Sequence, residues 1–187
     1  MEFLRIILSA VAGAVLLLLF PVSARAQAPE YQVKAAMLYR FALFVEWPAR
    51  EFSTDTSPFV VCVLGKNPFG SWLRQEMGET RVGTHPVEIR RMEKAEAARG
   101  CHMVFISRSE EGRLKQALDP LRNASVLIIS DVSDINEFCL LGGMIGLVME
   151  DDKVRFELNS KAAEQAGLKI DSRLKRIAKS AECGGAP

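Results

Sequence analysis

Two histidines, an acidic residue at a strand end and a glycine-bounded loop are the residues whose types and positions could support chemistry. His102 directly follows Cys101 at the start of an expected strand. Adjacent strand residues point to opposite faces, which disfavours a Cys–His nucleophile pair. Asp131 follows the apolar run 126–130, where acids of α/β enzymes often lie, and it equally suits the N-cap of the next segment. We therefore predict no catalytic residue and no enzyme, with a small hydrolase that uses Asp131 as an alternative.

The loop Gly65–Gly70 lies between an expected strand and an expected helix, which is where phosphate-binding loops occur. It lacks the Lys-Ser/Thr pair that follows the second glycine of a Walker A loop, and Pro68 removes one amide donor. A tight capped turn is the stronger interpretation. Ligands of parallel sheets bind outside the carboxyl ends of the strands, so this loop is the candidate ligand cleft. Its candidate residues are Gly65, Lys66, Asn67 and Gly70.

Composition argues against metal, cofactor and nucleic acid. The chain has 187 residues with four cysteines and two histidines, and no cysteine spacing is Cys-x-x-Cys. Asp151-Asp152 lacks the ligand spacing of a calcium loop. With 24 Lys+Arg against 23 Asp+Glu, the formal net charge of +1 gives no general attraction for nucleic acid or an anionic membrane. We predict no cofactor and no metal.

Residues 1–26 have the layout of a secretory signal peptide. Arg5 precedes an apolar run over 6–20, and Ala24-Arg25-Ala26 is an A-x-A site. We predict cleavage between Ala26 and Gln27, which leaves a single periplasmic domain over 27–187 with a core at about 31–180. A retained membrane anchor is the alternative, but a span needs roughly 20 apolar residues. No lipobox cysteine precedes the mature start, so no lipid anchor is expected.

Export would place the four cysteines in an oxidising compartment, where an even number favours pairing. Cys62 lies inside the apolar run PFVVCVLG, and Cys101 opens the run CHMVFIS. If these two strands are neighbours in one sheet, their Cβ atoms can reach disulfide distance. We favour a Cys62–Cys101 bond over two separately buried thiols, and we assign no partner to Cys139 or Cys183.

Hydrophobic periodicity predicts alternating helices and strands. The first helix, over 31–47, carries Val33, Met37, Phe41 and Phe44 at helical spacing. Strands are expected at 57–65, 82–92, 101–106 and 126–130. Helices or turns are expected between them at 68–77, 94–99 and 109–121, and a polar loop or short helix follows at 131–141. A hairpin (144–149 and 154–158) and helices at 160–166 and 172–181 follow. This order predicts an α/β fold, a three-layer-like sandwich with a mostly parallel central sheet and a C-terminal antiparallel hairpin.

Five segments occur in a specific order: YQVKAAMLYRFALFVEWP, VCVLGKNPFG, CHMVFISRSE, SVLIISD and LGGMIGLVMEDDKVRFELNSKAAEQAGLKIDSRLKRIA. Together they resemble the YfiR family of small periplasmic proteins over about Tyr31 to Ala178. The resemblance implies an α/β sandwich, often dimeric, without a known catalytic centre. It also implies a regulator that binds the periplasmic part of an inner-membrane diguanylate cyclase and represses it, which lowers cyclic-di-GMP and biofilm formation.

The expected last helix is the candidate partner surface. Leu174, Ile177 and Ala178 form a narrow apolar stripe there, and Lys175 stands where the family often has a second leucine. We predict Leu174 and Ile177 as partner contacts, with docking on the domain's own core as the other interpretation. A homodimer stays open. The alternative function is a periplasmic small-ligand-binding or solute-sensing domain.

Overall fold

The computed structural model describes residues 27–180 and 182. The whole of the predicted signal peptide, residues 1–26, falls outside these residues, and so does Cys183. None of the helices in the described part of the chain is both long and apolar enough to cross a membrane.

Strands in the described residues form a seven-stranded sheet in the order β3-β4-β2-β5-β6-β7-β8. Two edge strands, β3 (Arg81–Val82) and β8 (Lys153–Leu158), pair antiparallel with their neighbours. The five central strands run parallel: β2 (Phe59–Leu64), β4 (His85–Met92), β5 (Met103–Ile106), β6 (Leu127–Ser130) and β7 (Ile145–Glu150). The predicted mostly parallel sheet with a C-terminal antiparallel hairpin is confirmed. Numbered along the chain, the parallel strands have the spatial order 2-1-3-4-5, which is typical of doubly wound α/β folds.

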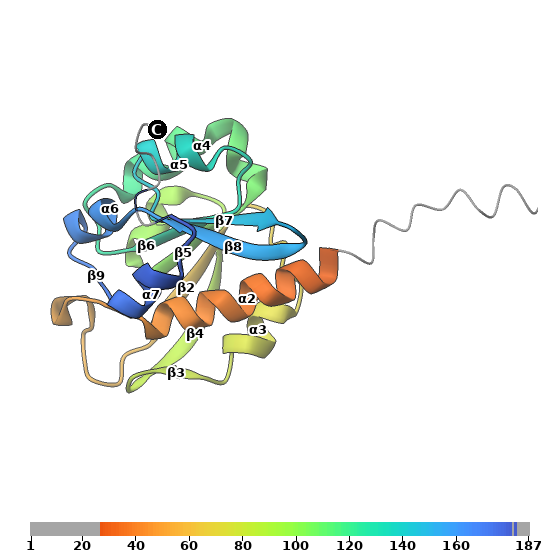
Figure 1. Ribbon diagram of the computed structural model, residues 1–187. Helices are drawn as coiled ribbons and strands as arrows, with labels where there is room; N and C mark the ends of the chain where they lie inside the picture. The colour runs from red at the N-terminus through yellow and green to blue at the C-terminus, as the bar shows by residue number, and fades with distance from the viewer. Residues whose placement is uncertain (1–26, 181, 183–187) are drawn as a thin grey trace, which may run out of the picture.

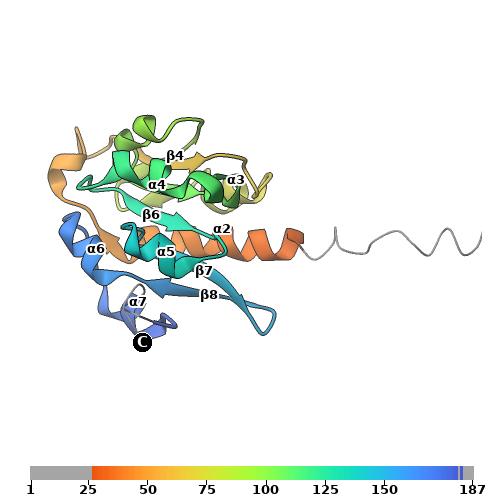
Figure 2. The ribbon, with the colours of Figure 1, turned by 90° about the horizontal axis from the view of Figure 1, so that it is seen from above.

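Helices cover both faces of this sheet (Figure 1). α2 (Gln27–Leu43) and α3 (Trp72–Met77) lie on one side, and α4 (Leu114–Leu118) and α5 (Ile135–Leu140) lie on the other. Seen from above in Figure 2, α5 lies over β6 and β7. Gly146 of β7 permits this approach, because a Cβ at that position would overlap the side chain of Ile135. Two further helices, α6 (Ser160–Gln165) and α7 (Ser172–Ile177), follow the hairpin.

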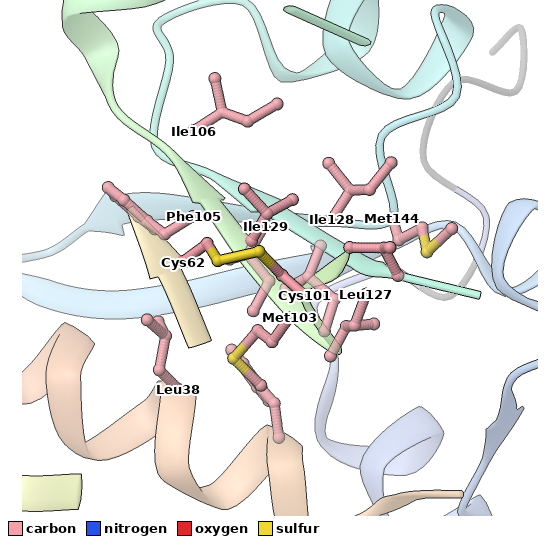
Figure 3. Close-up of a cluster of buried hydrophobic side chains, with 14 of the residues drawn as sticks. Leu38, Cys62, Cys101, Met103, Phe105, Ile106, Leu127, Ile128, Ile129 and Met144 are labelled. Atoms are coloured by element: carbon pink, nitrogen blue, oxygen red, sulfur yellow. A yellow bond between two sulfur atoms is a disulfide. The ribbon is translucent and has the colours of Figure 1, made fainter. Parts of the chain in front are cut away.

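The sheet centre forms the core. Every residue of β2, β5 and β6 is buried, as expected for parallel strands covered on both faces. The Cys62–Cys101 disulfide is present, with the two Cα atoms 6.1 Å apart, and it confirms the predicted pairing. Figure 3 shows this bond within a cluster of buried side chains that includes Met103, Phe105 and Ile129.

α2 buries a different face from the expected one. Leu38 and Phe41 are buried as part of the core, but Val33 is 47% exposed and Lys34 is 1% exposed. The helix is rotated so that Lys34, rather than Val33, points inward, because Lys34 pairs with the buried carboxylate of Asp131. The apolar stripe expected from the sequence includes Val33 but not Lys34.

Several expected elements are shorter or divided. The helix expected at 109–121 consists of η5 (Arg108–Arg113), α4 and η6 (Asp119–Leu121), with Pro120 inside the last turn. The strand expected at 82–92 is interrupted by a turn at Gly83, whose φ of +60° favours glycine. α3 begins at Trp72 rather than at Pro68. Two further 3-10 helices are η3 (Ala49–Glu51) and η4 (Ala95–Gly100).

A two-stranded sheet was not predicted. β1 (Val45–Glu46) pairs antiparallel with β9 (Lys169–Ile170), so the end of α2 lies beside the segment that leads into α7. The backbone N–H of Asp171 donates to the carbonyl of Phe44 (2.9 Å), and the Arg173 guanidinium lies over the Phe44 ring at 4.9 Å. The pairing fixes α7 against the N-terminal helix.

Candidate interaction and ligand sites

The loop after β2 lies at the topological switch point of the sheet, between the carboxyl ends of β2 and β5. Gly65 has a φ of +86°, and a Cβ there would lie 2.5 Å from Glu110 Oε1. The N–H of Lys66 donates to Ser109 Oγ (2.9 Å), and the N–H of Phe69 donates to Asn67 Oδ1 (3.0 Å). The sequence-predicted residues Gly65, Lys66, Asn67 and Gly70 thus lie in one tight turn, in which the N–H groups of Lys66 and Phe69 bond within the protein. Ligand binding at this turn stays a prediction.

A buried ionic cluster occupies the carboxyl end of β6. Lys34 Nζ lies 2.7 Å from Asp131 Oδ2 and 2.5 Å from Glu30 Oε1. The Tyr31 hydroxyl donates to the same Asp131 oxygen (2.8 Å), and Arg108 donates two hydrogen bonds to the Asp131 carbonyl. The first turns of α2 are thereby tied to the end of the central sheet.

Asp131 also influences the ionisation of the neighbouring Tyr31 hydroxyl. Burial and the neighbouring Asp131 carboxylate raise the pKa of Tyr31 well above its usual range. Asp131 Oδ1 is a buried side-chain oxygen without a hydrogen-bond partner in the described residues. Since the Asp131 side chain is fully buried and ion-paired, it contacts no solvent-exposed cleft in this structure. Asp131, the acid that the hydrolase alternative requires, is therefore not exposed to solvent in this structure.

Both histidines lie at the opposite, amino end of the parallel strands. His85 begins β4, and His102 directly precedes β5. The Phe52 ring stacks between them, with ring centroids 3.8 Å from His85 and 4.5 Å from His102. The structure therefore does not bring Asp131 and a histidine together. Among the described residues, no group of three or more His, Cys, Asp and Glu is placed to hold a metal ion.

The two predicted partner contacts on α7 differ in exposure. Leu174 is 1% exposed and belongs to the core, so its prediction as a partner contact is corrected. The helix begins at the N-cap Asp171, which accepts a hydrogen bond from Arg173 N–H (2.7 Å), and this phase points Leu174 inward. Ile177 is 67% exposed, and Lys175 forms an ion pair with Glu164 rather than interrupting an apolar surface. Ile177 alone remains an accessible candidate contact.

A cavity with a mixed apolar and polar lining, which the sequence did not indicate, lies in the helical layer above β6. Its volume is about 290 Å³, and its lining includes Leu118, Leu121, Ile128, Leu141 and Met144. Leu140, which is 73% exposed, also lines it. Residues from η6, α5, α6 and β6 meet here, and only the tertiary packing brings them together.

These features define a class of protein: a disulfide-bonded α/β domain that carries exposed apolar residues and buried ionic groups but no assembled catalytic set in its described part. Its sequence matches the model of the YfiR/HmsC-like family over residues 31–179, and the chain belongs to that family. The family comprises periplasmic, non-catalytic regulators of cyclic-di-GMP signalling, and the buried disulfide fits the periplasm. A search of curated proteins finds no match.

Sequence reasoning missed Lys34 and Phe52. Lys34 had a usable signal, because Lys34, Leu38 and Phe41 share one helix face and Glu30 lies four residues before Lys34. Phe52 had none, since it lies in a polar segment far from both histidines along the chain. Cys139 is buried and is not a free thiol, which the sequence could not decide.

Proposed function

We propose that this protein binds the periplasmic part of an inner-membrane diguanylate cyclase and represses it. The observation that carries the proposal is the family match over residues 31–179. Export through the predicted signal peptide would place the domain in the compartment where such a partner is accessible. The near-neutral charge of the chain favours apolar contacts over long-range steering.

Ile177 is the proposed apolar contact on α7. Leu174 is buried and anchors one face of the helix in the core. Ile177, a large aliphatic side chain, is 67% exposed on the same helix and is accessible to a partner. A few such residues usually supply most of the energy of an interface. Arg173 and Arg176 flank it on the same helix, so a partner surface with an apolar pocket and acidic rim would be complementary.

The test is reconstitution of the purified protein with the membrane cyclase encoded in the same genome. Cyclic-di-GMP synthesis should fall as the protein is added, and the protein should bind the isolated periplasmic part of the cyclase. An Ile177→Asp variant should bind at least about tenfold more weakly, because it places a charge in an apolar contact. Leu140→Asp is the matched control, since Leu140 is 73% exposed on α5 in the other helical layer.

The outcomes distinguish the role of α7 as the contact surface from the repressor function of the protein. Normal binding by Ile177→Asp would remove α7 from the interface and leave the repressor proposal in place. Absence of both binding and repression by the unaltered protein would reject the repressor proposal itself.

A second candidate is a small-ligand sensor, which the cavity of about 290 Å³ beside Leu140 favours. Its lining combines apolar side chains with the polar Arg122, Asn123 and Gln165, which suits a small ligand that has both apolar and polar groups. An Ala166→Leu variant, which would fill part of the cavity, should lose any ligand-induced rise in thermal midpoint that the unaltered protein shows with small aromatic probes.

A further inference from the structure

The chain's two histidines lie on the two sides of a single phenylalanine ring. Phe52 is stacked on His85 and on His102, and each pair of rings has an interplanar angle of 16°. His102 also stacks on Phe59 of β2 at 5.0 Å. Both imidazole side chains of the chain thus lie on one aromatic stack.

Both nitrogens of the His102 ring are bonded to backbone groups. Nδ1 lies 3.0 Å from the N–H of Val60, which can only donate, so Nδ1 accepts. Nε2 lies 3.2 Å from the carbonyl of Glu51, which can only accept, so Nε2 carries the proton. The structure therefore requires the neutral ring. A second proton would sit on Nδ1, directly against the Val60 N–H, and His102 could not keep both its charge and its position.

Residues 49–57 depend on these rings for their attachment to the sheet. Residues 49–51 and 53–56 are exposed, whereas Phe52 is half-buried within the stack. His102 donates to the Glu51 carbonyl, and His85 Nδ1 donates to the Ser57 carbonyl (2.8 Å). The segment also has other contacts: the Thr84 hydroxyl donates to the Asp55 carbonyl, Arg50 reaches Ser125 Oγ at 3.5 Å, and Phe52 packs against the core.

The charged groups near His102 come from two elements. His85 of β4 opposes protonation of His102, while the Glu51 carbonyl and carboxylate of η3 favour it, and Arg50 pairs with that carboxylate. Burial is the largest effect and holds the pKa of His102 below its ordinary value of 6.5. His85 differs in one respect, because its hydrogen bond to Ser57 survives a second proton on Nε2.

We propose that protonation of His102 releases residues 49–57 from the amino end of the sheet, so that this segment opens as the solution becomes acidic. Opening uncovers His102 and Phe59 beside the disulfide-linked strands. This inference does not depend on the identity of any partner.

The experiment is an NMR titration of the oxidised protein, labelled with ¹⁵N and ¹³C, from pH 8 to the onset of acid unfolding. The His102 imidazole should titrate below the ordinary histidine value of about 6.5. The amides of residues 49–57 and of Val60 should follow the midpoint of His102, while those of α6 should not. Because opening takes up one proton, the opening equilibrium that hydrogen exchange measures at Val60 should rise by up to about tenfold for each unit by which the pH falls below the ordinary histidine pKa of about 6.5.

Two variants make the result specific. In His102→Gln, the pH dependence of the segment should disappear. In His85→Gln, the transition should persist and its midpoint should move to higher pH, because a charge that opposes protonation of His102 is gone. If His102→Gln does not fold, His85→Gln still tests the proposal through the shift of the midpoint. The proposal is overturned if the His102 ring titrates without change in residues 49–57, if the segment follows His85, or if His102 stays neutral until the whole domain unfolds.

Discussion

Lys34 and Asp131 show how one pair of residues sets the orientation of a helix. The ion pair is fully buried, and its acceptor oxygen also receives the Tyr31 hydroxyl. Buried pairs add little stability over apolar replacements, but the loss of one member leaves an uncompensated charge. The main effect of the pair is therefore to determine which face of α2 is buried. Its contribution to the stability of the domain is smaller.

A double-mutant cycle tests this view of the pair. Lys34→Met should lower the free energy of unfolding by about 3–5 kcal/mol, because the buried Asp131 side chain would be left without its cationic partner. Lys34→Met combined with Asp131→Asn should recover a large part of that loss. Urea denaturation measures both, and a double variant that loses the sum of the two single losses would contradict the coupling.

Leu174 and Ile177 offer a matched comparison on one helix. Leu174→Ala should lower the free energy of unfolding by about 2–5 kcal/mol, because it empties a packed position. Ile177→Ala should change it by no more than about 0.5 kcal/mol, since most of that side chain is already in water. Thermal or urea unfolding of the two variants measures the difference. Equal losses would place Ile177 in the core as well.

At the scale of elements, the Cys62–Cys101 bond joins β2 to the residue pair that leads into β5. The bond closes a segment with a sequence separation of 39, and the loop-entropy relation predicts about 4 kcal/mol of stabilisation. Cys62→Ala, Cys101→Ala and the double variant should each lose about this amount, because breaking the bond once removes the whole constraint. Urea unfolding of purified protein is the measurement. A double variant as stable as the parent would show that the strands need no cross-link.

At the scale of the whole molecule, the neutral His102 makes folding pH-dependent. Its pKa is lower in the folded than in the unfolded chain, chiefly because of burial. The unfolded chain therefore binds the proton first, and stability falls as pH drops below the unfolded value of about 6.5, levelling off below the folded pKa. Denaturation at pH 7.5 and at pH 5.5 should show a loss in the unaltered protein that is smaller in His102→Gln. A loss of equal size in both would assign it to other groups.

The sequence by itself determined the local and covalent features of this protein. Apolar runs of β-branched residues predicted β2, β5 and β6, because strands buried on both faces have few polar positions. Their alternation with helices predicted the mostly parallel sheet. The Cys62–Cys101 pair followed from two such runs and a predicted export signal, and the ordered segments led to the family.

Only the tertiary structure decided which residues meet from distant parts of the chain. Lys34 contacts Asp131 across 97 residues, and Phe52 stacks on His85 and His102 from a loop with no periodic signal. The same holds for Leu174 and Ile177, whose exposure depends on the phase that the Asp171 cap and the β1–β9 pairing give α7. Sequence patterns report neighbours one strand or one helical turn away. Burial and charge pairing depend on contacts between elements, which the packing of the whole domain fixes.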